Sequence, residues 1–199
     1  MGHEAYSCDY LPCSGGHPEW HIQGDIIKHL ETVGPDYYDM IISFPSCTYL
    51  TVSNNGPMAR GCSKYTIEEG KELRRQGIEF FMYFVNYPCK LKAIENPIGI
   101  MSSLYRKPDQ IIQPYEFGHD ASKKTCLWLF GLPLLKPTGR ITGRMVNGRE
   151  RFSNQTDSGQ NKLTPSDTRA TERSKTYTGI AEAMAAQWPG TKNLSNTLF

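Results

Sequence analysis

The sequence has no long apolar run, no internal repeat and no dense cysteine framework. None of its apolar stretches approaches the roughly 20 residues that a membrane-spanning helix needs. The six cysteines are scattered along the chain, and the first residues lack a charged, apolar and small-residue signal. Reduced thiols in a cytosol are the simplest interpretation of this cysteine usage. We therefore expect a soluble, intracellular protein.

Length and charge set the next limits. A chain of 199 residues and 22.5 kDa is long enough for one domain with a full core and too short for two ordinary ones. The net charge is only +2, but residues 136–175 carry nine Lys or Arg against four Asp or Glu. This segment is also rich in Gly, Ser, Thr and Asn. It is either an electrostatic footprint for nucleic acid or a solvated loop, and its charge favours neither.

Short apolar segments that end in an acid or a cysteine predict a parallel sheet in an α/β fold. One such segment ends at Asp9 and a second at Asp25. A third, residues 39–44, runs into Pro45, which cannot donate to a strand ladder, so Cys47 is expected on the loop just beyond the strand. The sequence thus places a thiol at the carboxyl end of a strand.

A fourth segment, residues 91–94, runs into Glu95, Asn96 and Pro97. In open α/β sheets, ligands bind in the crevice outside the carboxyl ends of the strands. We therefore expect Glu95 and Cys47 at neighbouring strand ends, as an acid and a nucleophile of one site.

The remaining pattern divides the chain into three parts. A helix is predicted from Thr66 to the break at Pro88, with a cap and early acids, and a strand over 125–130. A second good helix covers 178–188. We predict a catalytic core (1–135), a basic insertion that serves as a small recognition region (136–175), and a C-terminal helix on the core with a frayed tail (176–199).

A cysteine thiolate beside a carboxylic acid can attack a pyrimidine. The thiolate adds to C6 while the acid stabilises charge at N3, and C5 becomes a carbanion that can accept a methyl group. A lone cysteine is more often buried packing. The joint occurrence of Cys47 with Glu95 favours the chemistry over that alternative.

These residues resemble the DNA cytosine-5 methyltransferases, in particular the compact phage or prophage type. The Pro-Cys motif of that family is similar to Pro45-Ser46-Cys47, and its Glu-Asn motif to Glu95-Asn96. Flanking stretches resemble the subfamily as well, over 21–25, 106–114, 117–119, 124–129 and 174–188. The likeness covers nearly the whole chain, from Gly2 to Trp188.

The resemblance implies a Rossmann-like, mostly parallel sheet that binds S-adenosylmethionine, with a cytosine flipped out of DNA into the site. It implies that Cys47 is the nucleophile and that Glu95 contacts and protonates N3. It also implies a cytoplasmic location, in a bacterium or a phage-infected cell. The further roles that it implies are catalytic for Lys124; cofactor-binding for Asp9 (ribose), Tyr10 (stacking on adenine), Asp25 (adenine amino group), Ile26 and Pro45; and substrate-binding for Asn96, Lys123, Arg140 and Arg144.

The sequence departs from the family at its first motif, a strand and Gly-rich turn that approach the methionine end of the cofactor. Nothing before Gly2 stands in its place. We expect that the gene starts further upstream, that a partner chain supplies the strand, or that the protein no longer methylates. In the last case it is a catalytically incomplete methyltransferase that binds DNA or a protein in phage counter-defence.

A structural zinc site is a separate alternative. Cys8, Cys13, His17 and His21 have the spacing C-x4-C-x3-H-x3-H, which a metal could use. The other interpretation places Cys8 in a strand and the next two residues in a Gly/Pro loop, with no metal. We expect this second interpretation.

Overall fold

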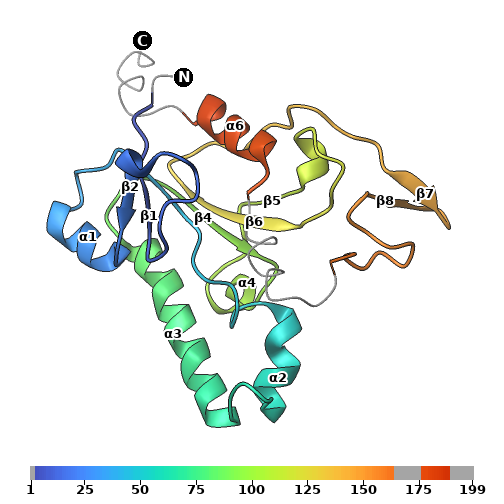
Figure 1. Cartoon of the computed structure of the whole chain (residues 1–199), viewed down its shortest axis with the longest axis horizontal. Helices are drawn as coiled ribbons and strands as arrows, with labels where there is room; N and C mark the ends of the chain where they lie inside the picture. Colours follow the sequence, from blue (N-terminus) through green and yellow to red (C-terminus); the bar gives the residue numbers. More distant parts are fainter. Residues whose placement is uncertain (1–2, 164–175, 189–199) are drawn as a thin grey trace.

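The computed structural model describes residues 3–163 and 176–188 (Figure 1). Its fold is mixed α/β, as the sequence predicts. Part of the basic insertion, 164–175, and the predicted tail, 189–199, lie outside the described residues. The strands are β1 (Ser7–Asp9), β2 (His21–Gln23), β3 (Met40–Ser43), β4 (Leu91–Pro97), β5 (Gln110–Ile112), β6 (Thr125–Phe130), β7 (Arg144–Val146) and β8 (Arg149–Arg151). The α-helices are α1 (Ile26–Val33), α2 (Asn55–Arg60), α3 (Ile67–Asn86), α4 (Met101–Leu104) and α6 (Thr178–Gln187), with 3-10 turns η1 (Pro18–Trp20), η2 (Val52–Asn54) and η3 (Pro114–Glu116).

The main sheet has the strand order β3-β4-β6-β5. Strands β3 and β4 are parallel, with Ser43 opposite Ile94. Strand β6 runs antiparallel to both β4 and β5, so β3, β4 and β5 all point the same way. The carboxyl ends of β3 and β4 therefore meet at one edge of the sheet, as predicted.

Side chains of the sheet alternate between its two faces and pack into a separate apolar cluster on each face. Ile94 and Trp128 point to one face, where they pack with Leu30 of α1 and with residues of α3 and α4. Ala93 and Leu127 point to the other face, which α6 covers with Ile180, Ala183 and Met184 (Figure 1). Burial on both faces explains why β6 reads as a near-continuous apolar run. The sheet is thus a central layer between helices.

The long helix α3 begins and ends where the sequence predicts. Thr66 caps it, since its hydroxyl accepts from the Glu69 N–H while the Glu69 carboxylate accepts from the Thr66 N–H. The helix ends at Asn86, two residues before Pro88. Its last carbonyls are satisfied by Lys92 of β4, whose ammonium donates to Val85 O at 2.7 Å and Tyr87 O at 2.5 Å. A buried lysine therefore fastens α3 to the sheet.

Strands β1 and β2 form a parallel pair of their own. The chain passes from β2 into α1, and Leu30 of α1 packs in the same cluster as Ile41 of β3, which places the pair at the β3 end of the sheet. One sequence expectation, that the second strand ends at Asp25, needs correction here. The second strand ends at Gln23, and Asp25 is instead the N-cap of α1, because its carboxylate accepts from the Ile27 N–H at 2.9 Å.

The basic insertion carries the hairpin β7–β8, which extends away from the body in Figure 1. Asn147 and Gly148 connect its strands with φ of 49° and 73°, the positive angles that a tight two-residue hairpin turn requires. Among the residues that the structure describes, no helix combines the length and apolar character needed to cross a bilayer.

Candidate functional site

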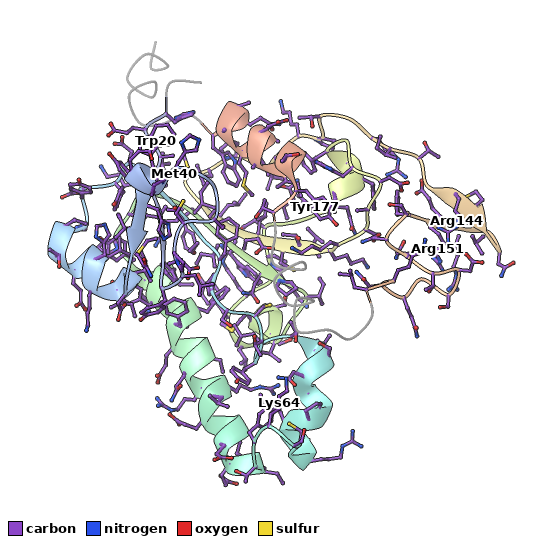
Figure 2. All side chains as sticks on the ribbon, in the orientation of Figure 1. Trp20, Met40, Lys64, Arg144, Arg151 and Tyr177 are labelled. Carbon is purple, nitrogen blue, oxygen red and sulfur yellow. The ribbon has the colours of Figure 1, made fainter. Side chains whose placement is uncertain are left out.

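A small pocket lies where the end of β4 meets β6 and α6. Glu95 of β4 and Thr125 of β6 contribute to its wall, and Tyr177, labelled in Figure 2, closes it from the start of α6. Strand β4 extends through Pro97, so Glu95 lies within the strand, opposite Leu127, and not beyond its end as predicted. The full lining is Phe44, Glu95, Lys123, Thr125, Thr176, Tyr177, Ile180 and Met184.

The Glu95 carboxyl is held toward its protonated form. Burial raises the pKa of Glu95, and the charge of Lys123 and a hydrogen bond with Thr125 lower it only in part. A carboxyl with a raised pKa keeps its proton nearer to neutral pH than an ordinary glutamate does. Glu95 is therefore suited to donate a hydrogen bond or a proton to a ring nitrogen.

The Cys47 loop is fastened to the end of β4 by buried polar contacts. The side-chain amide of Asn96, 1% exposed, donates to the Pro45 carbonyl at 2.8 Å. Cys47 then opens a turn in which its carbonyl accepts from the Leu50 and Thr51 N–H groups at 3.0 and 3.1 Å. Asn96, expected to bind substrate, is thus used within the protein, and it joins the two strand ends.

Two further contacts hold the far side of this loop. The Ile100 N–H donates to Leu50 O at 2.8 Å, and a Cβ added at Gly99 would lie 2.3 Å from the same oxygen. Only glycine permits this close approach of two backbones. From α3, Arg74 donates to Tyr49 O at 3.1 Å and to the Asn55 side chain at 2.8 Å.

The described pocket does not contain the cysteine. Cys47 is half-buried on its turn, while Phe44, three residues earlier, lines the pocket with Glu95. The pocket volume is about 20 Å³, enough for about one water molecule. A nucleobase would therefore require Phe44 or its neighbours to move, and that movement would have to open the space between Cys47 and Glu95.

The two lysines before β6 have different surroundings. Lys123 lines the pocket and its charge lowers the pKa of Glu95, whereas Lys124 is exposed and does not line the pocket. The sequence assigns the catalytic role to Lys124. The geometry brings Lys123 to the acid instead.

The residues expected to hold a cofactor cluster in part. Tyr10, 69% exposed, forms a hydrogen bond with Asp25 that raises the pKa of its hydroxyl. Desolvation alone would raise the pKa of Asp25, but hydrogen bonds from Ile27 and Tyr10 lower it overall. Asp9 accepts from the Leu11 N–H at 2.9 Å, and Ile26 packs on the cluster around Leu30, a residue of α1. Acids and an exposed aromatic face therefore lie together after β1 and β2.

An unpaired hydroxyl lies at the end of β3. Ser43 is 5% exposed, and its Oγ has no hydrogen-bond partner among the described residues. A buried hydroxyl without a partner costs roughly 1–3 kcal/mol, so such groups are rare in proteins. The side chain of Ile42, the preceding residue of β3, is 37% exposed.

The two arginines expected to contact DNA make ion pairs within the insertion. Arg140 pairs with Glu150 at 2.6 Å and its guanidinium lies 4.9 Å from the centre of the Tyr115 ring. Arg144 pairs with Asp157 at 2.6 Å, and Figure 2 shows it on the hairpin, well away from Tyr177. Both arginines brace the insertion, and each remains about half exposed.

The residues of the zinc alternative have other partners. Both ring nitrogens of His21 lie within hydrogen-bond distance, 2.8 Å from the Ser7 hydroxyl and 2.9 Å from Leu11 O. His17 stacks on Trp20 with ring centres 4.8 Å apart. Within 3–163 and 176–188, no three His, Cys, Asp or Glu residues are grouped so that they could hold a metal ion.

Sequence reasoning misses the C-terminal wall of the pocket. Tyr177 lies more than 80 positions after Glu95, and the sequence marks Thr125 only as the start of a strand. The pairing of β4 with β6 brings Thr125 close to Glu95, and a sequence that predicts a strand does not say which strand it pairs with. Burial raises the pKa of Tyr177, so its hydroxyl stays protonated beside the acid.

Neither models of known protein families nor curated protein sequences give a match to this chain. The likeness to cytosine-5 methyltransferases therefore rests on the motif residues of the sequence alone.

Proposed function

We propose that this chain is a DNA cytosine-5 methyltransferase of Rossmann-like fold that acts through a covalent adduct between Cys47 and cytosine. The observation that carries the proposal is the bond from Asn96 to the Pro45 carbonyl, at 2.8 Å. It ties the loop of the thiol to the strand of the acid at one edge of the sheet. A lone buried cysteine would need no such arrangement.

The chemistry follows from these side chains. The Cys47 thiolate would form a bond to C6 of the base, and the C5–C6 π electrons would shift toward C5 as Glu95 donates its proton to N3. Methylation at C5, loss of the C5 proton to water and return of the N3 proton to Glu95 would let the C6–S bond break, which restores the ring and releases the thiolate. The raised pKa of Glu95 supports its place as the acid.

S-adenosylmethionine would supply the methyl group, and the residues after β1 and β2 fit its adenosine part. Asp9 keeps a carboxylate oxygen for ribose hydroxyls, and the exposed ring of Tyr10 offers a stacking face. Asp25, fixed by the helix α1 that it caps, holds the Tyr10 hydroxyl. The unpaired Ser43 hydroxyl at the end of β3 is a further polar group that a ligand could satisfy.

We further propose that a partner chain adds a strand beside β3, which would extend the sheet without being required for the cofactor binding and methyl transfer expected of this chain alone. Strand β3 pairs only with β4, and β1 only with β2, among the described residues. Edge strands readily accept another strand. DNA is the second partner, contacted by the basic insertion through its charge.

Calorimetry and methyl transfer test the proposal together. The chain is titrated with S-adenosylmethionine and then assayed for transfer of labelled methyl groups to DNA, beside Cys47→Ala and the matched control Cys62→Ala. Cys62 is exposed on the turn before α3, away from the pocket. We expect micromolar cofactor binding in all three and transfer in all but Cys47→Ala.

The alternative function is a DNA- or protein-binding module without turnover. The small volume of the pocket and the separate β1–β2 pair favour it. DNA retention on a filter with no cofactor heat and no transfer would establish this alternative and refute the methyltransferase.

A further inference from the structure

The pocket lysine is carried by a turn that two distant side chains hold in place. Gln113, buried after β5, accepts from the Lys123 N–H at 3.0 Å and from the Ser122 hydroxyl at 3.3 Å through one oxygen. On the other side, Asn154 of the basic insertion accepts from the Ser122 N–H at 2.9 Å and donates to Ser122 O at 2.9 Å. The turn before β6 is thus clamped between the core and the insertion.

The insertion reaches this turn through more than one bond. The Ser153 N–H donates to the Asp120 carboxylate at 3.0 Å, and the Ser153 hydroxyl donates to the Asp120 carbonyl. Asn154 is itself held, since its carbonyl accepts from the Lys162 N–H at 2.9 Å. Two consecutive residues of the insertion, Ser153 and Asn154, therefore form hydrogen bonds with Asp120 and Ser122 of the turn.

We propose that Asn154, together with Gln113, is a positioning residue that keeps Lys123 facing Glu95, and that the basic insertion is thereby coupled to the pocket. The two-point contact of an asparagine amide with the backbone of Ser122 fixes both the position and the direction of the peptide that leads into Lys123. An insertion that only bound DNA would not need this contact. The role given to Lys123 beside Glu95 rests on the proposed function, whereas the contacts that hold the turn do not depend on it.

The pKa of the Glu95 carboxyl is the readout, because the charge of Lys123 lowers it. Among the described residues, the other titratable groups near Glu95 are Tyr177, which lines the pocket, and Cys126, the next residue of β6 after Thr125. Both stay neutral over the range where a carboxyl titrates, since burial raises the pKa of the Cys126 thiol and of the Tyr177 phenol. A change in the Glu95 titration in the variants below therefore reports on Lys123.

The experiment titrates the full chain, labelled with ¹³C at glutamate carboxyls, and assigns Glu95 by its loss in Glu95→Gln. Lys123→Met is expected to raise the pKa of Glu95. Asn154→Ala is expected to raise it by less. Asn161→Ala, a control in the same segment whose side chain accepts from the Leu163 N–H, is expected to leave it unchanged. In the Lys123→Met background, Asn154→Ala should have no further effect.

The proposal would be overturned if Lys123→Met shifted the pKa of Glu95 while Asn154→Ala left it at the wild-type value. It would also be overturned if Asn154→Ala shifted that pKa equally in the wild-type and Lys123→Met backgrounds. Ser153→Ala, a milder change at the same contact, tests the same coupling if Asn154→Ala does not fold. The outcome is independent of turnover. If the pKa of Glu95 shifts as expected but no methyl group is transferred, the proposed function alone is refuted. If methyl groups are transferred but the pKa does not shift, this inference alone is refuted.

Discussion

Replacing Asn96 by alanine should weaken the contact between the two strand ends on which the site depends. The wild-type amide is fully buried and donates to the Pro45 carbonyl at 2.8 Å. Its loss removes a hydrogen bond and leaves a buried carbonyl unpaired, which together cost about 2 kcal/mol. For a protein of this size, that free energy lowers the melting temperature by roughly 4–8 °C.

Thermal unfolding followed by circular dichroism measures the effect, with Asn86→Ala as the matched control. Asn86 is exposed at the end of α3, so its truncation should change stability by less than about 0.5 kcal/mol. The thiol of Cys47, followed by alkylation and peptide mass spectrometry, should react faster in Asn96→Ala than in the wild type, because the loop is no longer tied to β4.

Asn96→Asp separates the hydrogen bond from the volume of the side chain. An ionised aspartate cannot donate to the carbonyl and is costly to bury, so its pKa in the folded state must rise. The stability of Asn96→Asp should therefore be highest below the ordinary aspartate pKa and fall as pH rises through the folded-state value. Wild-type melting temperatures for both Asn96 variants at neutral pH would refute the reasoning.

Three further predictions concern single contacts. Lys92→Met removes the ammonium that donates to Val85 O and Tyr87 O, although Tyr87 O keeps its bond from the Cys89 N–H, and should lower the unfolding free energy by about 1–3 kcal/mol in urea titrations. Gly99→Ala forces a Cβ against the backbone of the Cys47 loop and should lower the melting temperature, whereas Gly24→Ala, with no atom within 4 Å, should not. Glu95→Gln should stabilise the protein at pH 8 but not at pH 4. The folded-state pKa of Glu95 is raised, so ionisation costs stability as pH rises above the unfolded-state pKa, and the cost is complete above the folded-state pKa. Equal melting temperatures of Glu95→Gln and the wild type at pH 8 would contradict this.

Local signals predicted the elements well. Thr66 and Glu69 determine the start of α3 through a contact that a sequence shows directly, and Pro88 determines its end. Proline after β3 likewise placed Cys47 on a loop. These signals act over a few residues, so the tertiary structure had little scope to override them.

Long-range pairing could not be predicted in the same way. Strand β6 inserts antiparallel between β4 and β5, and this pairing brings Thr125 and the turn of Lys123 to Glu95. Nothing in the sequence distinguishes Lys123 from Lys124. The register of β6 determines which of these two neighbours points into the pocket. Arg144 was expected to contact DNA, but it forms an ion pair with Asp157. The charge pattern of the sequence does not predict this pair, because it depends on how the hairpin folds.

Trapping of the covalent adduct tests the central claim most directly. DNA that carries 5-fluorocytosine is incubated with the chain and S-adenosylmethionine, because fluorine at C5 cannot leave as a proton does and the C6–S bond then persists. The account predicts a denaturation-resistant complex of protein and DNA with the wild type, linked through Cys47 in the peptide mass spectrum, and none with Cys47→Ala. No complex with the wild type, or a complex that survives Cys47→Ala, would contradict it.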